Sequence, residues 1–284
     1  MAYNMGTSPG WQGYGVSFSR PLIMGIVNVT PDSFSDGGKF LNPEKAISHA
    51  LRLERQGADI IDVGGESSRP GSDPIELEQE IRRIVPVIQG IRKKSNIVIS
   101  IDTYKATIAD EALRSGANWV NDISGLRFDS AMVKVVKNWK CPVVVMHMKG
   151  QPKTMQLKPF YHDVLTELLD FFRERIQYLN GKGISKLILD PGIGFGKRLE
   201  DNLNILSSLE EFKSFGLPIL IGTSRKSFIG TITGHPVEKR LAGTLASQLW
   251  SVLHGAQIIR THDVSDTKDS IEIINAILQN VNMK

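Results

Sequence analysis

The feature that most limits the fold of this chain is a regular alternation of short apolar segments with longer stretches whose apolar residues recur at helical spacing. Alternating strands and helices favour parallel pairing through right-handed crossovers. The expected strands cover residues 23–29, 59–63, 97–101, 119–121, 142–146, 187–190, 218–222 and 257–260. Eight such repeats within 284 residues predict an α/β fold, a single (β/α)8 TIM barrel. A doubly wound sheet is the alternative, although it usually carries a glycine fingerprint in its first turn.

The barrel is expected to occupy the whole chain, residues 1–284, as one domain. Residues 1–20 precede the first expected strand and are predicted to form an extension that caps the lower end of the barrel. Several expected helices end in glycine just before the next strand, where a left-handed residue is favoured. These glycines are Gly57, Gly116, Gly183, Gly216 and Gly255.

The composition limits the cellular compartments and the classes of binding partner that are expected for this chain. No run of 18 apolar residues is present, so no membrane span is expected, and the N-terminus lacks the pattern of a secretory signal. The single cysteine, Cys141, cannot form an internal disulfide, which favours a reducing, cytoplasmic compartment. The 34 basic and 30 acidic residues are interleaved, so the net charge of +4 does not indicate a nucleic-acid partner. It is compatible with an anionic small substrate.

Polar residues follow the end of every expected strand. They are Asn28, residues 66–69, Asp102, Asn121 with Asp122, His147, Asp190, residues 224–227, and Arg260 with His262. Active sites of barrels lie at the carboxyl ends of the strands, where these residues meet. The sequence therefore predicts one polar site on that rim.

Some of these residues have structural alternatives. Asp102 precedes an expected helix and could cap it, and Asn121 with Asp122 could form an Asx turn. Asp190 is followed by "PGIGFGKR", with no helix starting nearby. We therefore predict that the Asp190 carboxylate meets a donor that the protein does not supply.

The rim residues fall into two expected groups. Aspartates, an asparagine and a lysine suit a flat heterocycle rich in N–H and carbonyl groups, because a carboxylate accepts two parallel hydrogen bonds from an aminopyrimidine edge. Asn28, Arg260 and His262 belong to the first and last strands, which are neighbours in a closed barrel. Arginine with histidine favours a phosphate group, and the asparagine amide offers an oxygen to Mg²⁺. The alternative for this second group is a surface salt bridge and a helix cap.

Three further features of the sequence do not indicate a separate function. "GIGFGKR" lacks the spacing and the final Ser or Thr of a phosphate-binding loop. Lys226 could form a Schiff base, but it lies in the loop after the seventh expected strand. Asp62 lies in the middle of a strand, and the sequence assigns it no role.

With these residues in view, the sequence resembles bacterial dihydropteroate synthase over essentially its whole length. The matching motifs are "MGIVNVTPDSFSDGG", "DVGGESSRPG", "SIDTYK", "NDISG", "DPGIGFGK", "GTSRKSFIG" and "RTHDV". The resemblance implies a transferase of folate biosynthesis. It would join 6-hydroxymethyl-7,8-dihydropterin diphosphate to p-aminobenzoate, with Mg²⁺ as cofactor and sulfonamides as competitors. It also implies a homodimer formed through the late helices.

The resemblance implies a role for each matching residue. The pterin would contact Asp102, Asn121, Met146, Asp190, Phe195 and Lys226. The diphosphate would contact Asn28, Arg260 and His262, with Mg²⁺ at Asn28. The p-aminobenzoate would contact Phe34, Ser68, Arg69, Pro70, Lys226 and Ser227. Many relatives have Thr where this chain has Ser68.

The implied reaction also suggests a function for the loop "TPDSFSDGG", which follows the first expected strand. The family is described as forming a pterin cation by loss of diphosphate in an SN1-like step, and such a cation must be shielded from water. The catalytic residues would be Asp102, Asp36, Lys226, Arg260 and His262, and the loop "TPDSFSDGG" would close over the site. The rival interpretations are the pterin-binding barrel of a cobalamin-dependent methyltransferase and a non-catalytic pterin-binding paralogue.

Overall fold

The computed structural model describes residues 11–30, 42–67 and 71–282 of this chain. Its eight strands are β1 (Leu22–Asn28), β2 (Ile60–Gly64), β3 (Val98–Asp102), β4 (Trp119–Asp122), β5 (Val143–Met146), β6 (Leu187–Asp190), β7 (Leu220–Ile221) and β8 (Ile258–Thr261). They form one sheet in the order β6-β5-β4-β3-β2-β1-β8-β7, and every pair of neighbours is parallel. A parallel bridge between Leu189 and Ile219 joins the two edges of the sheet. The predicted TIM barrel is confirmed.

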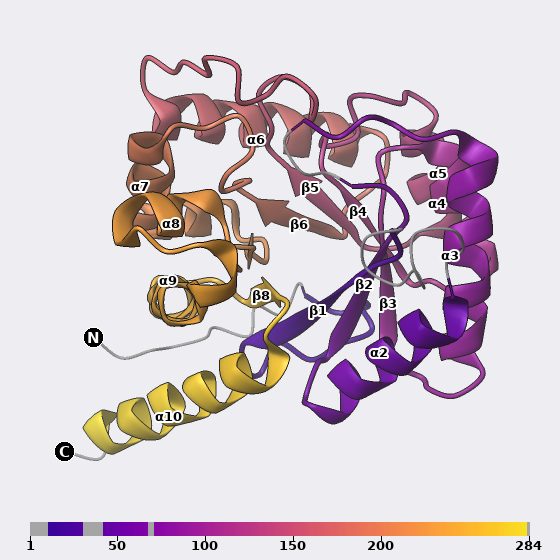
Figure 1. The fold of residues 1–284 in the computed structure, drawn as a ribbon. Helices are drawn as coiled ribbons and strands as arrows, with labels where there is room; N and C mark the ends of the chain where they lie inside the picture. Colours follow the sequence, from indigo (N-terminus) through magenta and orange to yellow (C-terminus); the bar gives the residue numbers. More distant parts are fainter. Residues whose placement is uncertain (1–10, 31–41, 68–70, 283–284) are drawn as a thin grey trace.

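The helices lie outside the strands, as Figure 1 shows. They are α2 (Pro43–Arg55), α3 (Leu77–Arg92), α4 (Ala106–Arg114), α5 (Met132–Trp139), α6 (Val164–Gly181), α7 (Leu199–Ser207), α8 (Ser227–Thr233), α9 (Leu241–Leu253) and α10 (Val264–Asn282), with 3-10 turns η1 (Leu209–Phe215) and η2 (Val237–Lys239). The five glycines predicted to end helices have positive φ, from 65° to 112°. None of the helices in the described ranges is long and apolar enough to cross a membrane.

Strand β7 is shorter than the expected 218–222. Pro218 has no N–H to donate, although its carbonyl accepts from Leu189 N at 2.8 Å and so helps to close the barrel. Ile219 pairs with Leu189 in an isolated bridge, and its carbonyl accepts from Gln257 N at 2.9 Å and from Ile258 N at 3.1 Å. At the other end, a Cβ on Gly222 would lie 3.7 Å from Arg260 Cβ, so this glycine leaves room beside the arginine.

The lower end of the barrel is filled by apolar side chains from the strands and from residues 11–20. Tyr14 and Phe18 are buried in a cluster with Trp119 and the inward residues of several strands. The Tyr14 hydroxyl donates to Leu187 O at 3.1 Å, and Trp119 Nε1 donates to Tyr14 O at 2.7 Å. Because this end is packed and apolar, polar inward side chains gather toward the opposite end.

Between the barrel and the helices lies a second, larger core. Helix α6 shows how the sequence builds it: Asp163 caps its first turn by accepting from Leu165 N at 3.0 Å. Val164, Leu168 and Phe172 then recur at helical spacing and are buried against the barrel. These contacts hold the strands in position, and the strands in turn position the residues at the rim of the barrel.

Candidate active site

A row of polar side chains crosses the first four strands in register. Asn28 pairs with Gly64, Gly64 with Asp102, and Asp102 with Asn121. Gly64 lacks a side chain, and a Cβ built on it would lie 3.8 Å from Asn28 Oδ1 and 3.7 Å from Asp102 Oδ2. The space above Gly64 is therefore faced by two oxygen ligands from neighbouring strands.

Arg260 lies at the centre of the site and joins the two groups that the sequence separates. Its Nε donates to Asp62 Oδ2 at 2.6 Å, and its Nη2 donates to Asp102 Oδ2 at 2.7 Å. Asn121 Nδ2 also donates to Asp62 Oδ2, at 3.0 Å. The alternative of a surface salt bridge for Arg260 is wrong, because only 20% of its side chain is exposed and Asp62 is fully buried.

Asp62, which the sequence could not assign, is thus the support of this network. Asp62, Asn121 and Arg260 come from β2, β4 and β8, which are alternate strands, as in one layer of inward side chains in a TIM barrel. Among the described residues, Asp62 Oδ1 and Asn121 Oδ1 are buried without a hydrogen-bond partner. Buried polar atoms of this kind are costly unless a ligand or water satisfies them.

Burial and neighbouring charges shift the pKa values of this network in opposite directions. Burial raises the pKa of Asp102 to about 7, against the pull of Arg260 and with the help of the Asp62 carboxylate. Burial tends to lower the pKa of Arg260, but Asp62 and Asp102 together raise it above its ordinary value. Arg260 therefore stays charged, while Asp102 titrates near neutral pH.

Asp190 and Lys226 form the other side of the site. Asp190 Oδ1 accepts from Gly192 N at 2.7 Å, so the prediction that the protein supplies this carboxylate with no donor is wrong for that oxygen. Burial raises the pKa of Asp190, and Lys226 opposes the shift. Burial also lowers the pKa of Lys226 to about 8. The Lys226 ammonium donates to Ile193 O and lies 4.5 Å from the centre of the Phe195 ring.

The apolar walls come from the loops after β4, β5 and β6. Met146 is buried in a small cluster with Ile123, Met148 and Met155, against which Tyr104 and Phe195 pack. Met146 ends β5 and pairs with Asp190 on β6. An apolar wall thus lies beside the Asp190 carboxylate.

Hydrogen bonds settle the alternatives for Asp102 and for Asn121 with Asp122. Asp122, not Asn121, makes the Asx turn, because its Oδ1 accepts from Ser124 N at 2.7 Å. Thr103, not Asp102, bonds to the backbone before α4: its hydroxyl accepts from Lys105 N at 3.2 Å. His262 Nδ1 lies 2.9 Å from Ser224 Oγ, which ties the ends of β7 and β8 together.

Comparison with known proteins identifies the family. The profile of the family described as "Pterin binding enzyme" matches residues 24–262. The dihydropteroate synthase of Escherichia coli K12 is 44% identical over 269 residues, which cover 94% of this chain and 95% of that protein. The chain belongs to the dihydropteroate synthase family.

Solved structures of this family have the same fold. The Yersinia pestis dihydropteroate synthase, solved with a sulfonamide drug, is 42% identical to this chain and superposes with a TM-score of 0.87. The match covers 93% of this chain and 96% of the Yersinia pestis chain. The Xanthomonas albilineans dihydropteroate synthase with 4-aminobenzoic acid is 41% identical with a TM-score of 0.87. That match covers 92% of this chain and 94% of the other.

Five residues that the resemblance to dihydropteroate synthase implicates lie outside the described residues. They are Phe34, Asp36, Ser68, Arg69 and Pro70. Of the remaining p-aminobenzoate residues, Ser227 is exposed at the first position of α8 and directly follows Lys226. The predicted loop "TPDSFSDGG" also falls almost wholly outside the described ranges.

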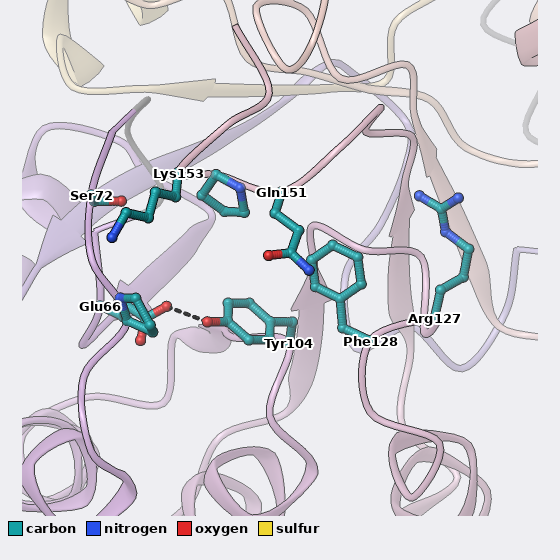
Figure 2. A pocket seen from close by; sticks show the side chains of 9 residues that line it. Glu66, Ser72, Tyr104, Arg127, Phe128, Gln151 and Lys153 are labelled. Carbon is teal, nitrogen blue, oxygen red and sulfur yellow. Dashed lines mark hydrogen bonds between the residues drawn. The ribbon is translucent and has the colours of Figure 1, made fainter. Parts of the chain in front are cut away.

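A cavity of about 370 Å³ lies between the segments that follow β2, β3, β4 and β5, whose side chains line it (Figure 2). None of the residues predicted to bind pterin or diphosphate lines it. Two of its lining side chains are bonded to each other, since the Tyr104 hydroxyl donates to Glu66 Oε1 at 2.6 Å. Lys105, outside the lining, contacts Glu66 Oε2 through its Nζ at 2.6 Å and the buried Glu80 Oε2 at 2.7 Å. This network fixes the start of the loop after β2. Nothing in the sequence pattern predicts these contacts, although Lys105 ends the motif "SIDTYK".

Proposed function

We propose that this rim joins 6-hydroxymethyl-7,8-dihydropterin diphosphate to p-aminobenzoate and releases diphosphate. The observation that carries the proposal is Arg260 bonded to Asp102, since it connects a heterocycle-binding carboxylate to a phosphate-binding cation. In this arrangement Asp102, Asn121 and Asp190 bind the polar edge of the pterin. Met146 and Phe195 cover its faces, and Lys226 donates to a ring acceptor.

The diphosphate is assigned to Arg260, His262 and Asn28. Arg260 uses Nε and Nη2 for the two aspartates, so we assign Nη1 to a diphosphate oxygen. Charge-assisted hydrogen bonds from a guanidinium suit this group. His262 is held by Ser224 at the end of the neighbouring strand, which aims its ring along the same rim.

The residues present fit Mg²⁺ that arrives with the substrate. No group of three or more His, Cys, Asp or Glu side chains within the described ranges is arranged to hold a metal. Magnesium, however, commonly takes one or two protein oxygens and completes its shell with substrate phosphates and water. Asn28 Oδ1, which faces the missing side chain of Gly64, would be such a ligand. The bound ion would neutralise negative charge that develops on the leaving diphosphate.

The chemical step follows from these charges. The C–O bond to diphosphate breaks first, and the electron-rich dihydropterin carries the resulting cation. The Asp102 carboxylate stabilises this cation, while Arg260 and His262 stabilise the departing diphosphate. The aniline nitrogen of p-aminobenzoate attacks the cation and loses its proton afterwards, so no strong base is needed. Ser227 is assigned to bind the p-aminobenzoate carboxylate. Sulfonamides would compete with p-aminobenzoate for this site.

The test is the release of diphosphate from dihydropterin diphosphate, with and without p-aminobenzoate. The proposal expects release to be coupled to the formation of 7,8-dihydropteroate. Tight binding of the pterin without release under either condition would instead show a non-catalytic binding protein. Transfer of a methyl group from a reduced folate would show a methyltransferase.

The assembly and the compartment are also proposals. Late helices and turns expose apolar side chains, which suits a homodimer: they are Ile232, Val237, Leu241, Trp250, Leu253, Ile273 and Ile277. Sedimentation at twice the 31.4 kDa of one chain would support this state. The single, buried Cys141 supports a reducing, cytoplasmic location.

The kcat/KM for dihydropterin diphosphate is expected to follow a narrow bell-shaped pH profile. Asp102 must be a carboxylate and Lys226 an ammonium in their proposed roles, and burial moves their pKa values to about 7 and about 8. Activity should therefore fall as the pH drops below about 7 and again as it rises above about 8. Steady-state kinetics across this range measures both limbs.

Lys226→Arg is the control for this profile, since arginine keeps its charge at these pH values. The variant should lose the alkaline limb and keep the acid limb, whatever its absolute rate. Ionisations of the substrates are common to both enzymes and cancel in the comparison. An alkaline limb that is unchanged in the variant would contradict the assignment to Lys226.

A further inference from the structure

The loop 191–198, between β6 and α7, lies backbone to backbone against the end of β5. A Cβ on Gly192 would lie 2.0 Å from His147 O, and one on Gly196 would lie 2.2 Å from Lys149 O. Both glycines also have positive φ, of 69° and 61°. No larger residue fits at either position without moving one of the two loops.

Four consecutive carbonyls of this loop each accept a hydrogen bond from a different side chain. Lys226 donates to Ile193 O, and Gln156 Nε2 donates to Gly194 O at 2.7 Å. Lys197 Nζ then donates to Phe195 O at 3.2 Å, and the Tyr161 hydroxyl donates to Gly196 O at 2.9 Å. The path of the loop is thus fixed residue by residue, and the pterin-facing Phe195 lies in the middle of it.

Lys197 is almost completely buried, with only 3% of the residue exposed. Besides Phe195 O, its Nζ contacts His147 O and His147 Nδ1, each at 3.1 Å. An ammonium has three N–H groups, so these three acceptors use all of them. The arrangement requires His147 Nδ1 to be the acceptor of a neutral imidazole, and burial lowers the pKa of His147 well below its ordinary value.

All three acceptors of Lys197 are uncharged, which makes its burial costly. Taking an ammonium out of water without a direct carboxylate partner is unfavourable, and burial lowers the pKa of Lys197 to about 7, although the charges of Asp190 and Asp201 oppose this shift. An apolar side chain would fill the same space without this cost. Buried charges held at such a cost are typical of functional sites, where they fix the position of other groups.

We propose that Lys197 is a positioning residue for the pterin site. It ties the loop 191–198 to the end of β5, so that the Phe195 ring and the Ile193 carbonyl, which holds Lys226, keep their places. Lys197 acts through these groups and does not touch the substrate. This inference rests on the proposed pterin-binding roles of Phe195 and Lys226.

The test is the affinity of Lys197→Met for 6-hydroxymethyl-7,8-dihydropterin diphosphate with Mg²⁺, measured by calorimetry. We expect Kd to rise at least about tenfold, because small displacements of binding groups have large effects. The KM for p-aminobenzoate, at saturating pterin substrate, should stay within about twofold of wild type. Lys186→Met is the matched control: Lys186 donates to Lys140 O at 3.2 Å, at the far end of β6, and its loss should leave both values unchanged.

A second variant guards against failure of Lys197→Met to fold. His147→Phe keeps a ring against Phe171, whose centroid is 4.9 Å away, but removes one acceptor from Lys197. A smaller rise in Kd, of about threefold, is expected, and the two changes together should not exceed Lys197→Met alone because they break one network. A core variant in α7, Ile205→Val, reports the effect of lowered stability alone and should leave Kd unchanged.

The outcomes separate this inference from the proposed function. If Phe195→Ala does not weaken pterin binding, the assignment of the site itself is wrong. If Phe195→Ala weakens binding but Lys197→Met and His147→Phe both stay within about twofold of wild type, the positioning role of Lys197 is overturned. An equal rise in the KM of both substrates would also overturn it, since it would show a general structural role.

Discussion

Asp102→Asn is expected to lower kcat for diphosphate release about 10²–10³-fold, the usual loss when one preorganised charge is removed from a transition state. The change keeps the size of the side chain and removes its negative charge. A pterin cation would then form above a neutral amide, with the positive Arg260 only 2.7 Å from the altered group. Single-turnover release of diphosphate measures the step directly.

The control for this prediction is Asp110→Asn in α4, the next helix along the chain. Asp110 bonds to Arg114 and Trp139 on the outside of the barrel and should be replaceable without loss of rate. A kcat for Asp102→Asn within about threefold of wild type would contradict the proposed cation stabilisation. A raised KM with unchanged kcat would place Asp102 in substrate binding alone.

Arg260→Met is expected to lower the free energy of unfolding by about 3–5 kcal/mol as well as abolish turnover. Removal of one partner from a buried ion pair leaves uncompensated charge, and here two carboxylates, Asp62 and Asp102, lose the same partner. Urea denaturation followed by circular dichroism measures the stability. Activity is lost separately, because the diphosphate loses its guanidinium.

Two further variants separate these effects. Arg82→Met removes an exposed pair with Glu78 and should change stability by less than about 0.5 kcal/mol. Adding Asp62→Asn to Arg260→Met removes one uncompensated charge and should restore part of the stability but none of the activity. If the double variant is less stable than Arg260→Met alone, the Asp62 charge is not the cause of the loss.

These two predictions share a feature of the site that the sequence did not reveal. The sequence separates a heterocycle group from a phosphate group, whereas the structure joins them through Arg260, 158 residues from Asp102 and 198 residues from Asp62 along the chain. Asp62 and Arg260 belong to the alternate strands β2 and β8, whereas Asp102 ends β3, the direct neighbour of β2. The stagger between strands decides which side chains share a layer inside the barrel. A sequence pattern with a period of two does not reveal this stagger.

Local sequence patterns also did not determine the structural roles of individual residues. Asn121 and Asp122 are both suited to an Asx turn, but Asp122 forms it and Asn121 bonds to Asp62 inside the barrel. Lys197 lies in the glycine-rich loop 191–198, and the sequence pattern does not indicate that its side chain is buried. It is buried because the loop packs against the end of β5, a contact between residues 50 positions apart.

The sequence by itself determined the barrel, its eight strands and the rim on which the polar residues lie, because strand and helix periodicity and turn-forming glycines are local properties of the chain. The motifs after the strands also indicated the family. Only the tertiary structure decided that Asp62 supports Arg260, that Gly192 donates to Asp190, and that Lys197 holds the loop carrying Phe195. Asp62 and Lys197 depend on how distant strands and loops meet, and the bond from Gly192 to Asp190 depends on the path of a loop pressed against the end of β5. The free energy of a buried charge is set by the groups that surround it in space.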